Sequence, residues 1–252
     1  VSHCGYEEDI KLSKELKNTE VDLIIGGHSH TLIDKVDKSL PIPVVQANSN
    51  GTHIGVFKAK VDIIKKCITD YDYSLIGTYT NLVEKDNEIE QLVQSEIDKM
   101  PEFFKPIAQI TEPLGFEART KETALGRFSV DALVDYFKVD CAFTTSKSIR
   151  NQISGPNVNQ FEIYNAFPFD NPLFKISMTA QNIKKFLEYY LNKKKDRFVY
   201  IPHTLSYTAE KTKDDKYKIT ELKLHNKIID GQRKVTVIID ERMVEEFERY
   251  YD

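Results

Sequence analysis

The sequence is poor in cysteine, with Cys4, Cys67 and Cys141 as the only three in 252 residues. Their number is odd and no C-x-x-C spacing occurs, which argues against a disulfide framework. Sparse cysteine favours a reducing, cytoplasmic compartment. A secreted or surface location stays open, because the chain begins with Val1 and a leader could precede it. We expect Cys4 to be a small buried residue rather than a ligand or nucleophile.

Long apolar runs and an excess of positive charge are also missing. No run approaches the roughly 18 apolar residues that a membrane-spanning helix needs. The chain has 35 Lys and Arg against 39 Asp and Glu, a net charge of −4, so it lacks the electrostatic footprint of nucleic-acid binding. With 40% hydrophobic and 29% charged residues, the composition is that of a globular protein with one or two domains and a sizeable core.

Two of the six histidines lie close together, in the stretch DLIIGGHSH at residues 22–30. The β-branched run Val21–Ile25 predicts a strand that is buried on both faces. The two glycines after it permit a tight turn and close backbone approach. His28 and His30 then lie at the carboxyl end of a strand, where α/β sheets bind ligands. Paired imidazoles suit a metal ion, although the motif alone leaves two solvated loop histidines as an alternative.

The rest of the chain alternates between helical and extended patterns. Before residue 85 we expect a helix over 7–18 and strands over 42–47 and 54–64. A helix over 86–100, capped by Asp86 or Asn87 and stopped by Pro101, connects to a second part. That part is predicted to contain strands at 107–114 and 140–145, helices at 126–138 and 179–196, and strands at 198–202, 204–210, 217–224 and 234–240.

Several longer stretches resemble a known family. SHCGYEEDIKLSKEL, VDLIIGGHSHTLID and PVVQANSNGTHIGVF resemble the second half of the calcineurin-like metallophosphoesterase domain of the 5′-nucleotidase family. ARTKETALGRFSVDAL, SIRNQISG and YNAFPFDNPLFKISMTAQNIKKFLE resemble that family's C-terminal, nucleotide-binding domain. The resemblance implies an α/β (α+β) chain. Residues 1–84 would form part of a metallophosphoesterase β-sandwich, and residues 85–252 an α/β substrate-binding domain.

The same resemblance implies a metal centre. It assigns His3, from S-H-x-G, and His28 and His30, from G-H-S-H, as ligands of two divalent ions such as Zn, Mn or Fe. The family's other ligands lie in D-x-H, G-D and G-N-H-E motifs, and none of these occurs here. The catalytic histidine of G-N-H-E is missing with them, so no catalytic residue is assigned in this chain. We therefore expect a C-terminal fragment of a longer enzyme, with negligible phosphatase turnover on its own.

Four further residues are implied to bind the substrate. Arg119 and Arg150 match positions where the family places arginine near the substrate, and a planar guanidinium suits phosphate. Phe169 matches a base-stacking position and Asn171 a base or ribose contact. From residue type alone, surface arginines and a core phenylalanine are the simpler interpretations.

Two departures from the family pattern affect base recognition. The family's G-G-G-[IL]-R is replaced here by Ser-Lys-Ser-Ile-Arg at residues 146–150. The loop G-G-D-G-[FY], whose aromatic sandwiches the base, has no equivalent in the C-terminal stretch IIDERMVEEFERYYD. We therefore expect phosphate recognition to dominate over discrimination among nucleobases.

The resemblance implies a metal-dependent phosphoesterase that hydrolyses the phosphate ester of nucleotides. One alternative is a module that binds a nucleotide or a partner without catalysis. Another is a phosphoesterase for a different ester, with the second domain as a scaffold. We also expect an open sheet edge in residues 1–65, through which the chain could associate with another chain.

Overall fold

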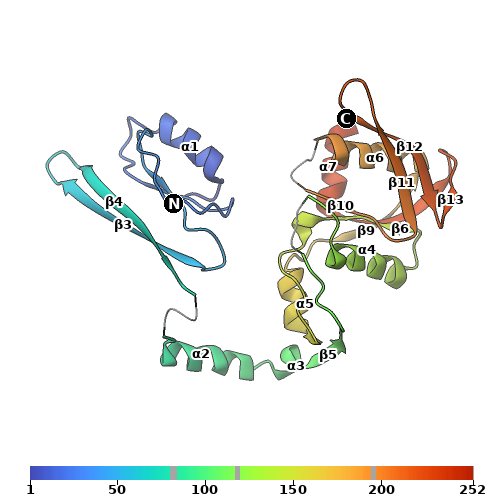
Figure 1. Cartoon of the computed structure of the whole chain (residues 1–252), viewed down its shortest axis with the longest axis horizontal. Coiled ribbons are helices and arrows are strands. Elements are labelled where there is room, and N and C mark those ends of the chain that lie inside the picture. The colour runs from blue at the N-terminus through green and yellow to red at the C-terminus, as the bar shows by residue number, and fades with distance from the viewer. Residues whose placement is uncertain (80–83, 117–119, 194–196, 252) are drawn as a thin grey trace. The chain divides into compact units, whose positions relative to one another are not determined.

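The computed structural model describes residues 1–79, 84–116, 120–193 and 197–251 (Figure 1). The predicted mixture of helices and strands is confirmed. The chain divides into two compact units, Val1–Gln94 and Ser95–Asp252, here called unit 1 and unit 2. The division lies within helix α2 (Asn87–Asp98).

Unit 1 begins with helix α1 (Tyr6–Glu15), followed by the short strands β1 (Ile24–Ile25) and β2 (Val44–Val45). The two strands are parallel, with Ile24 opposite Val44 and Ile25 opposite Val45. Ile24, Ile42 and Val44 form the buried apolar cluster, and four partly buried side chains pack against it: Tyr6, Leu12, Leu16 and Leu40.

The prediction that Val21–Ile25 forms a strand buried on both faces is wrong. The strand is limited to Ile24–Ile25, and both Val21 and Ile25 are exposed while Ile24 is buried. A doubly buried strand needs an apolar layer on each face. In the part of the chain that the structure describes, the apolar cluster includes Ile24 and neither Val21 nor Ile25.

A long antiparallel hairpin follows, made of β3 (His53–Asp62) and β4 (Cys67–Gly77) (Figure 1). The predicted strand over 54–64 corresponds to β3. Strand β4 was not predicted, because its sequence contains alternating aspartates and tyrosines and few aliphatic residues. Ile63 and Ile64, at the hairpin turn, are 86% and 95% exposed. They lie outside β3, which ends at Asp62.

Helix α2 confirms the predicted helix over 86–100 and its cap. The Asp86 carboxylate accepts hydrogen bonds from the backbone N–H groups of Glu88 and Ile89, at 2.9 and 3.2 Å. As predicted, this helix ends before Pro101, at Asp98. Pro101 is the first residue of a separate short helix, α3 (Pro101–Phe104), a position that suits its missing N–H. No residue of α2 is buried among those described, so its apolar stripe stays exposed.

The centre of unit 2 is a sheet in which β14 (Lys234–Asp240) lies between β6 (Cys141–Ala142) and β9 (Leu173–Thr179). Strand β14 runs parallel to β6 and antiparallel to β9. The predicted strand over 140–145 is divided into β6 and β7 (Thr144–Thr145), which belong to different sheets.

The remaining strands of unit 2 pair in antiparallel sheets. The strand order is β11–β12–β13 in one, while β7 pairs with β10 and β5 with β8. Their bounds are β5 (Pro106–Gln109), β8 (Asn157–Asn159), β10 (Val199–Tyr200), β11 (Leu205–Lys211), β12 (Tyr217–Leu224) and β13 (Lys227–Ile228).

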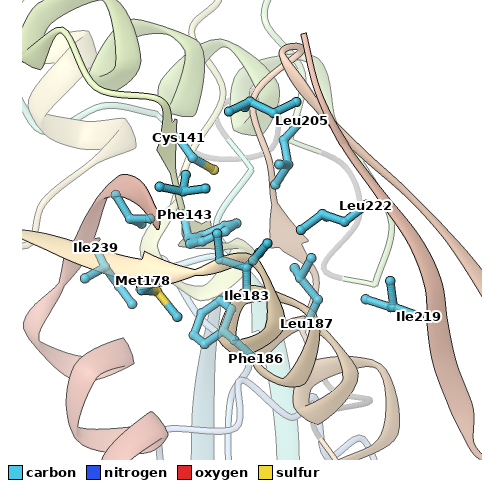
Figure 2. Packing of buried hydrophobic residues seen from close by; sticks show 14 of the residues in the cluster. Cys141, Phe143, Met178, Ile183, Phe186, Leu187, Leu205, Ile219, Leu222 and Ile239 are labelled. Atoms are coloured by element: carbon cyan, nitrogen blue, oxygen red, sulfur yellow. The ribbon is translucent and has the colours of Figure 1, made fainter. Parts of the chain in front are cut away.

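Helix α6 (Ala180–Lys193) builds one core of unit 2. As predicted, Thr179 caps it, with its hydroxyl accepting from the Asn182 N–H at 3.2 Å. Figure 2 shows Ile183, Phe186 and Leu187 of α6 in the same cluster as Leu222 of β12 and Ile239 of β14. Burial of this stripe confirms the i, i+3, i+4 pattern, although the predicted end at 194–196 lies outside the described residues.

Helix α4 (Ala124–Phe137) packs in a second apolar cluster, through Leu125 and Val130. Its cap, Thr123, accepts from the Gly126 N–H at 3.2 Å and shares a 3.0 Å hydrogen bond with the Tyr200 hydroxyl. Unit 2 also contains the 3-10 turn η1 (Ser146–Ser148), helix α5 (Gln160–Ala166) and helix α7 (Glu241–Tyr251).

The predicted burial of Cys4 is wrong. Cys4 is exposed, whereas Cys67 is partly buried and Cys141 is buried. The reason is that Cys4 precedes the first turn of α1, away from the apolar cluster of unit 1. In the described ranges, no helix combines the length and apolar character needed to cross a membrane.

Candidate functional site

The predicted histidine loop begins where β1 ends. His28 and His30 both have a left-handed backbone, with φ of 70° and 56°. Non-glycine residues rarely adopt this conformation, and it is frequent at ligand sites. The structure brings the His28 ring against that of His3, edge to face, with the ring centroids 5.1 Å apart. Gly27 permits this approach, because a Cβ there would lie 3.0 Å from Nδ1 of His3.

Ser29, between the two loop histidines, fastens the loop to its surroundings. Its hydroxyl accepts from the Tyr6 N–H at 3.0 Å, at the start of α1, and donates to Oε1 of Gln46 at 2.9 Å. The same Gln46 oxygen accepts from the Thr31 N–H at 2.9 Å. Gln46 follows β2 and is buried, so one amide side chain holds the middle and the C-terminal end of the histidine loop.

Asp9, on α1, lies against both segments that carry the histidines, at Ser2 and at Gly26. The carboxylate is fully buried and accepts from the Ser2 hydroxyl through Oδ1, next to His3. Its Oδ2 has no hydrogen-bond partner among the described residues. That oxygen lies where a side chain on Gly26 would be, 2.3 Å from an added Cβ. The Ser2 N–H also donates to the Ile25 carbonyl at 2.8 Å, so both segments meet at the end of β1.

The residues of this loop fit part of a metal site. Imidazoles are common ligands of divalent transition metals, and His3 and His28 are already adjacent and exposed to solvent. Over residues 1–79, 84–116, 120–193 and 197–251, however, no three His, Cys, Asp or Glu side chains are arranged to hold a metal ion. His30 belongs to the same loop, and its assignment as a ligand stays a prediction.

In unit 2 the structure brings Arg150 and Phe169 into contact. The guanidinium carbon of Arg150 lies 4.9 Å from the centroid of the Phe169 ring, within the range of a cation–π interaction. The backbone explains the contact. The Arg150 N–H donates to the Ala166 carbonyl at 2.8 Å, at the end of α5, and the segment that carries Phe169 leaves α5 there. Phe169 is half-buried, so it is neither a core residue nor a fully solvated one.

A second arginine, Arg242, lies equally close to the same ring, at 4.9 Å. The β9–β14 pairing places it there, because Asp240 is opposite Leu173 and the Glu241 N–H donates to the Pro172 carbonyl at 3.1 Å. The first turn of α7 therefore lies beside the Phe169 segment. At exposed sites each such cation–π contact is worth about 0.5–1 kcal/mol.

A cavity of about 240 Å³ adjoins Arg242 and carries both signs of charge. Arg197 donates to Glu246 at 2.7 Å, and the Tyr190 hydroxyl donates to the same carboxylate at 2.9 Å. The cavity is lined by Thr145, Lys147, Ser148, Arg197, Asp240, Arg242, Met243 and Glu246.

Asp240 is the buried carboxyl of this cavity, at the start of α7. Burial raises its pKa above the ordinary value of 3.8, and this effect outweighs the hydrogen bond that its carboxylate accepts from the Met243 N–H at 2.9 Å. Burial likewise raises the pKa of Tyr190, and the neighbouring Glu246 adds to this effect.

The remaining predicted substrate residues are placed less fully. Asn171 is half-buried on the segment between α5 and β9, two residues after Phe169. Arg119 lies outside the described residues. A larger cavity of about 660 Å³ lies beside α6 and β11, and none of the predicted site residues lines it.

Sequence reasoning missed the residues that support the site. Asp9 and Gln46 are polar residues beside apolar ones, and burial of such residues becomes visible only with the fold. Ser29 carried a usable signal, since it lies between the two histidines. Arg242 carried none, because Phe169 lies 73 positions earlier in the chain and the two residues meet only through the pairing of β9 with β14.

Comparison with protein families gives one match. The model of the 5′-nucleotidase C-terminal domain matches residues 106–250. This span includes Arg150, Phe169, Asn171 and Arg242, and it excludes the histidine loop.

Individual relatives extend over both units. The chain is 27% identical to the trifunctional nucleotide phosphoesterase protein YfkN of Bacillus subtilis, over 90% of this chain and 16% of that protein. It is 25% identical to a 5′-nucleotidase of Vibrio parahaemolyticus, over 94% of this chain and 50% of that protein. The chain thus spans half or less of the length of these relatives.

Solved structures show the same fold. A 5′-nucleotidase precursor of Thermus thermophilus superposes with a TM-score of 0.76 at 21% identity, over 97% of this chain and 53% of that one. The sulfate thiohydrolase SoxB of Thermus thermophilus superposes with a TM-score of 0.71 at 16% identity, over 99% of this chain and 51% of that one. Identities this low establish the fold alone.

Proposed function

The chain belongs to the 5′-nucleotidase family through its C-terminal domain, and from that premise we propose that it is part of a phosphoesterase that hydrolyses the phosphate ester of nucleotides. In this proposal unit 2 binds the nucleotide, and the histidine loop of unit 1 contributes to a metal site. The observation that carries the proposal is the contact of Arg150 with Phe169. Two residues assigned to the substrate from the sequence, 19 positions apart, lie together in the family-matched domain.

Each residue of this pair has a chemical role that the contact supports. The guanidinium of Arg150 is exposed and can donate charge-assisted, bidentate hydrogen bonds to a phosphate. The Phe169 side chain is an aromatic ring of the kind on which nucleobases stack. Asn171, two residues on, offers an amide for a base or ribose. Arg119 remains a proposed phosphate ligand from its sequence position.

In unit 1 we assign the metal-binding role to His3, His28 and His30. Bound divalent ions supply an activated water and neutralise phosphate charge during hydrolysis, and a dinuclear centre would do both. The chain's own contribution is positional. Ser29, Gln46 and Asp9 hold the two imidazole-bearing segments at the end of β1.

Calorimetric titration of the whole chain with AMP, UMP and ribose 5-phosphate tests this function. We expect all three to bind, because phosphate recognition dominates. Arg150→Ala removes a charged hydrogen bond worth about 1.5–3 kcal/mol, so it should weaken all three ligands by about 10- to 150-fold. Phe169→Ala should weaken the two nucleotides by less than about tenfold, near 1.4 kcal/mol, and spare ribose 5-phosphate.

Arg233→Ala is the matched control, since Arg233 is an exposed arginine of unit 2 that lies outside the site. It should bind all three ligands as the unmodified chain does. If the unmodified chain binds none of the phosphate esters, the proposed function is wrong. A loss beyond tenfold for Phe169→Ala, confined to one base, would show that base recognition rather than phosphate recognition dominates.

A further inference from the structure

Phe169 is the one ring in unit 2 against which two guanidinium groups lie at the same distance, among the contacts of the described residues. A ring this close to two cations presents little free face to a ligand. A planar base stacked between the ring and a guanidinium requires about 7 Å between the two outer layers, twice a contact of about 3.5 Å. At 4.9 Å, neither arginine leaves that space, so a base that stacks on Phe169 must move one of them.

The contacts of the two arginines show which one moves. Arg150 has an additional interaction besides the ring, and its backbone is tied to Ala166. Arg242 is exposed, and within the described ranges its guanidinium makes no direct ion pair and no hydrogen bond besides the ring contact, while its charge acts on the nearby Asp240 carboxyl. Its long side chain extends from the first turn of α7 beside the open cavity that Lys147 and Glu246 also line. Arg242 can therefore swing away from Phe169 without breaking an ion pair.

We propose that Arg242 is a base-contacting residue that determines specificity, and that its guanidinium stacks on the nucleobase once the base has entered against Phe169. This inference rests on the proposed function, in which Phe169 receives the base. Guanidinium planes stack on bases and add cation–π attraction, which a compact ammonium group cannot reproduce. The ligand class is a nucleoside 5′-monophosphate, sandwiched between an aromatic ring and an arginine. In the free protein the same guanidinium covers the ring.

The test compares Arg242→Ala and Arg242→Lys in the whole chain by calorimetry, with AMP and ribose 5-phosphate as probes. Ribose 5-phosphate carries the phosphate and sugar but no base. We expect Arg242→Ala to weaken AMP binding by about three- to tenfold and to change ribose 5-phosphate binding less than twofold. Arg242→Lys should lose as much AMP affinity as Arg242→Ala, because it keeps the charge and loses the plane. The exposed Arg233→Ala variant serves as the control.

Three results would overturn the assignment of Arg242. Equal losses for both probes, restored by Arg242→Lys, would mean that Arg242 binds the phosphate. Tighter AMP binding by Arg242→Ala would mean that the guanidinium only competes with the base. Unchanged AMP binding would mean that Arg242 does not touch it. Each of these requires the unmodified chain to bind AMP, and failure of that binding would instead contradict the proposed function.

Discussion

Unit 1 and unit 2 bury different kinds of residue. Unit 2 encloses two apolar clusters, one around α6 and one around α4, with fully buried aromatic rings in both. In unit 1 the buried apolar cluster comprises Ile24, Ile42 and Val44, and a carboxylate and an amide lie buried beside it. Large apolar burial stabilises a fold without fixing one loop, whereas buried polar groups impose a geometry at a cost in stability. We infer that unit 2 is stable independently of unit 1. In unit 1 the buried polar groups position the histidine loop.

The strongest test of this contrast is Phe186→Ala, in the core of unit 2. Phe186 is fully buried, and its ring lies 5.0 Å from those of Phe143 and Tyr190. The loss of buried area and the cavity left behind should cost about 3–5 kcal/mol. Hydrogen exchange of unit 2 peptides measures this loss, and peptides from residues 1–79 should keep their protection. Phe128→Ala, at a position 54% exposed, is the matched control and should change stability by less than about 0.5 kcal/mol. Equal loss of protection in both units would contradict their independence.

A smaller effect is expected from Gly26→Ala in unit 1. The added methyl would lie 2.3 Å from the buried Asp9 Oδ2, so the carboxylate or the loop must shift, at a cost of about 1–3 kcal/mol. NMR signals of the His3 and His28 rings should change, because both segments are braced by Asp9. The double variant Asp9→Ala/Gly26→Ala separates the causes. If the clash is with Asp9, the effects of the two substitutions on the free energy of unfolding will not be additive in a double-mutant cycle. Strictly additive effects would show that the destabilisation has another cause.

A still smaller, pH-dependent effect is expected from Asp240→Asn in unit 2. Burial raises the pKa of Asp240 in the folded chain above its value in the unfolded chain, about 3.8. The stability that protonated Asp240 contributes is therefore complete below about pH 3.8, and it is lost as the pH rises through the pKa of the folded chain. Asn keeps the cap on the Met243 N–H but cannot ionise. The melting temperature of Asp240→Asn, relative to that of the unmodified chain, should therefore rise as pH increases from below about 3.8 towards neutrality. Asp230→Asn, at an exposed position, is the control, and an unchanged pH profile in Asp240→Asn would contradict the assignment.

The sequence predicted best the elements whose stability is local. The apolar stripe of α6, with Thr179 as its cap, follows from spacing along one helix, and the cap of α2 follows from Asp86 alone. It predicted worst where burial depends on neighbours. The apolar run Val21–Ile25 does not reveal that Ile24 is buried while Val21 and Ile25 are exposed. The polar sequence of β4 gives no strand signal of its own, because its pairing with β3 stabilises it.

The candidate site divides in the same way. Arg150, Phe169 and the histidines were named from motifs, and the structure shows which of them meet. Asp9, Gln46 and Arg242 were missed, because their roles arise from contacts between segments far apart in the chain. The wrong expectation for Cys4 has the same origin, since residue type gave a preference for burial but no position in the fold.

We propose that unit 2 recognises the nucleotide by itself, whereas the histidines of unit 1 bind a metal. Calorimetric titration of AMP into the whole chain, first with a chelator and then with added Mn²⁺, tests it most directly, with His28→Ala and Phe169→Ala as variants. We expect that AMP binds in the presence of the chelator, that Phe169→Ala weakens this binding, and that His28→Ala leaves it unchanged. AMP binding that requires Mn²⁺ and disappears in His28→Ala would contradict nucleotide recognition by unit 2 alone.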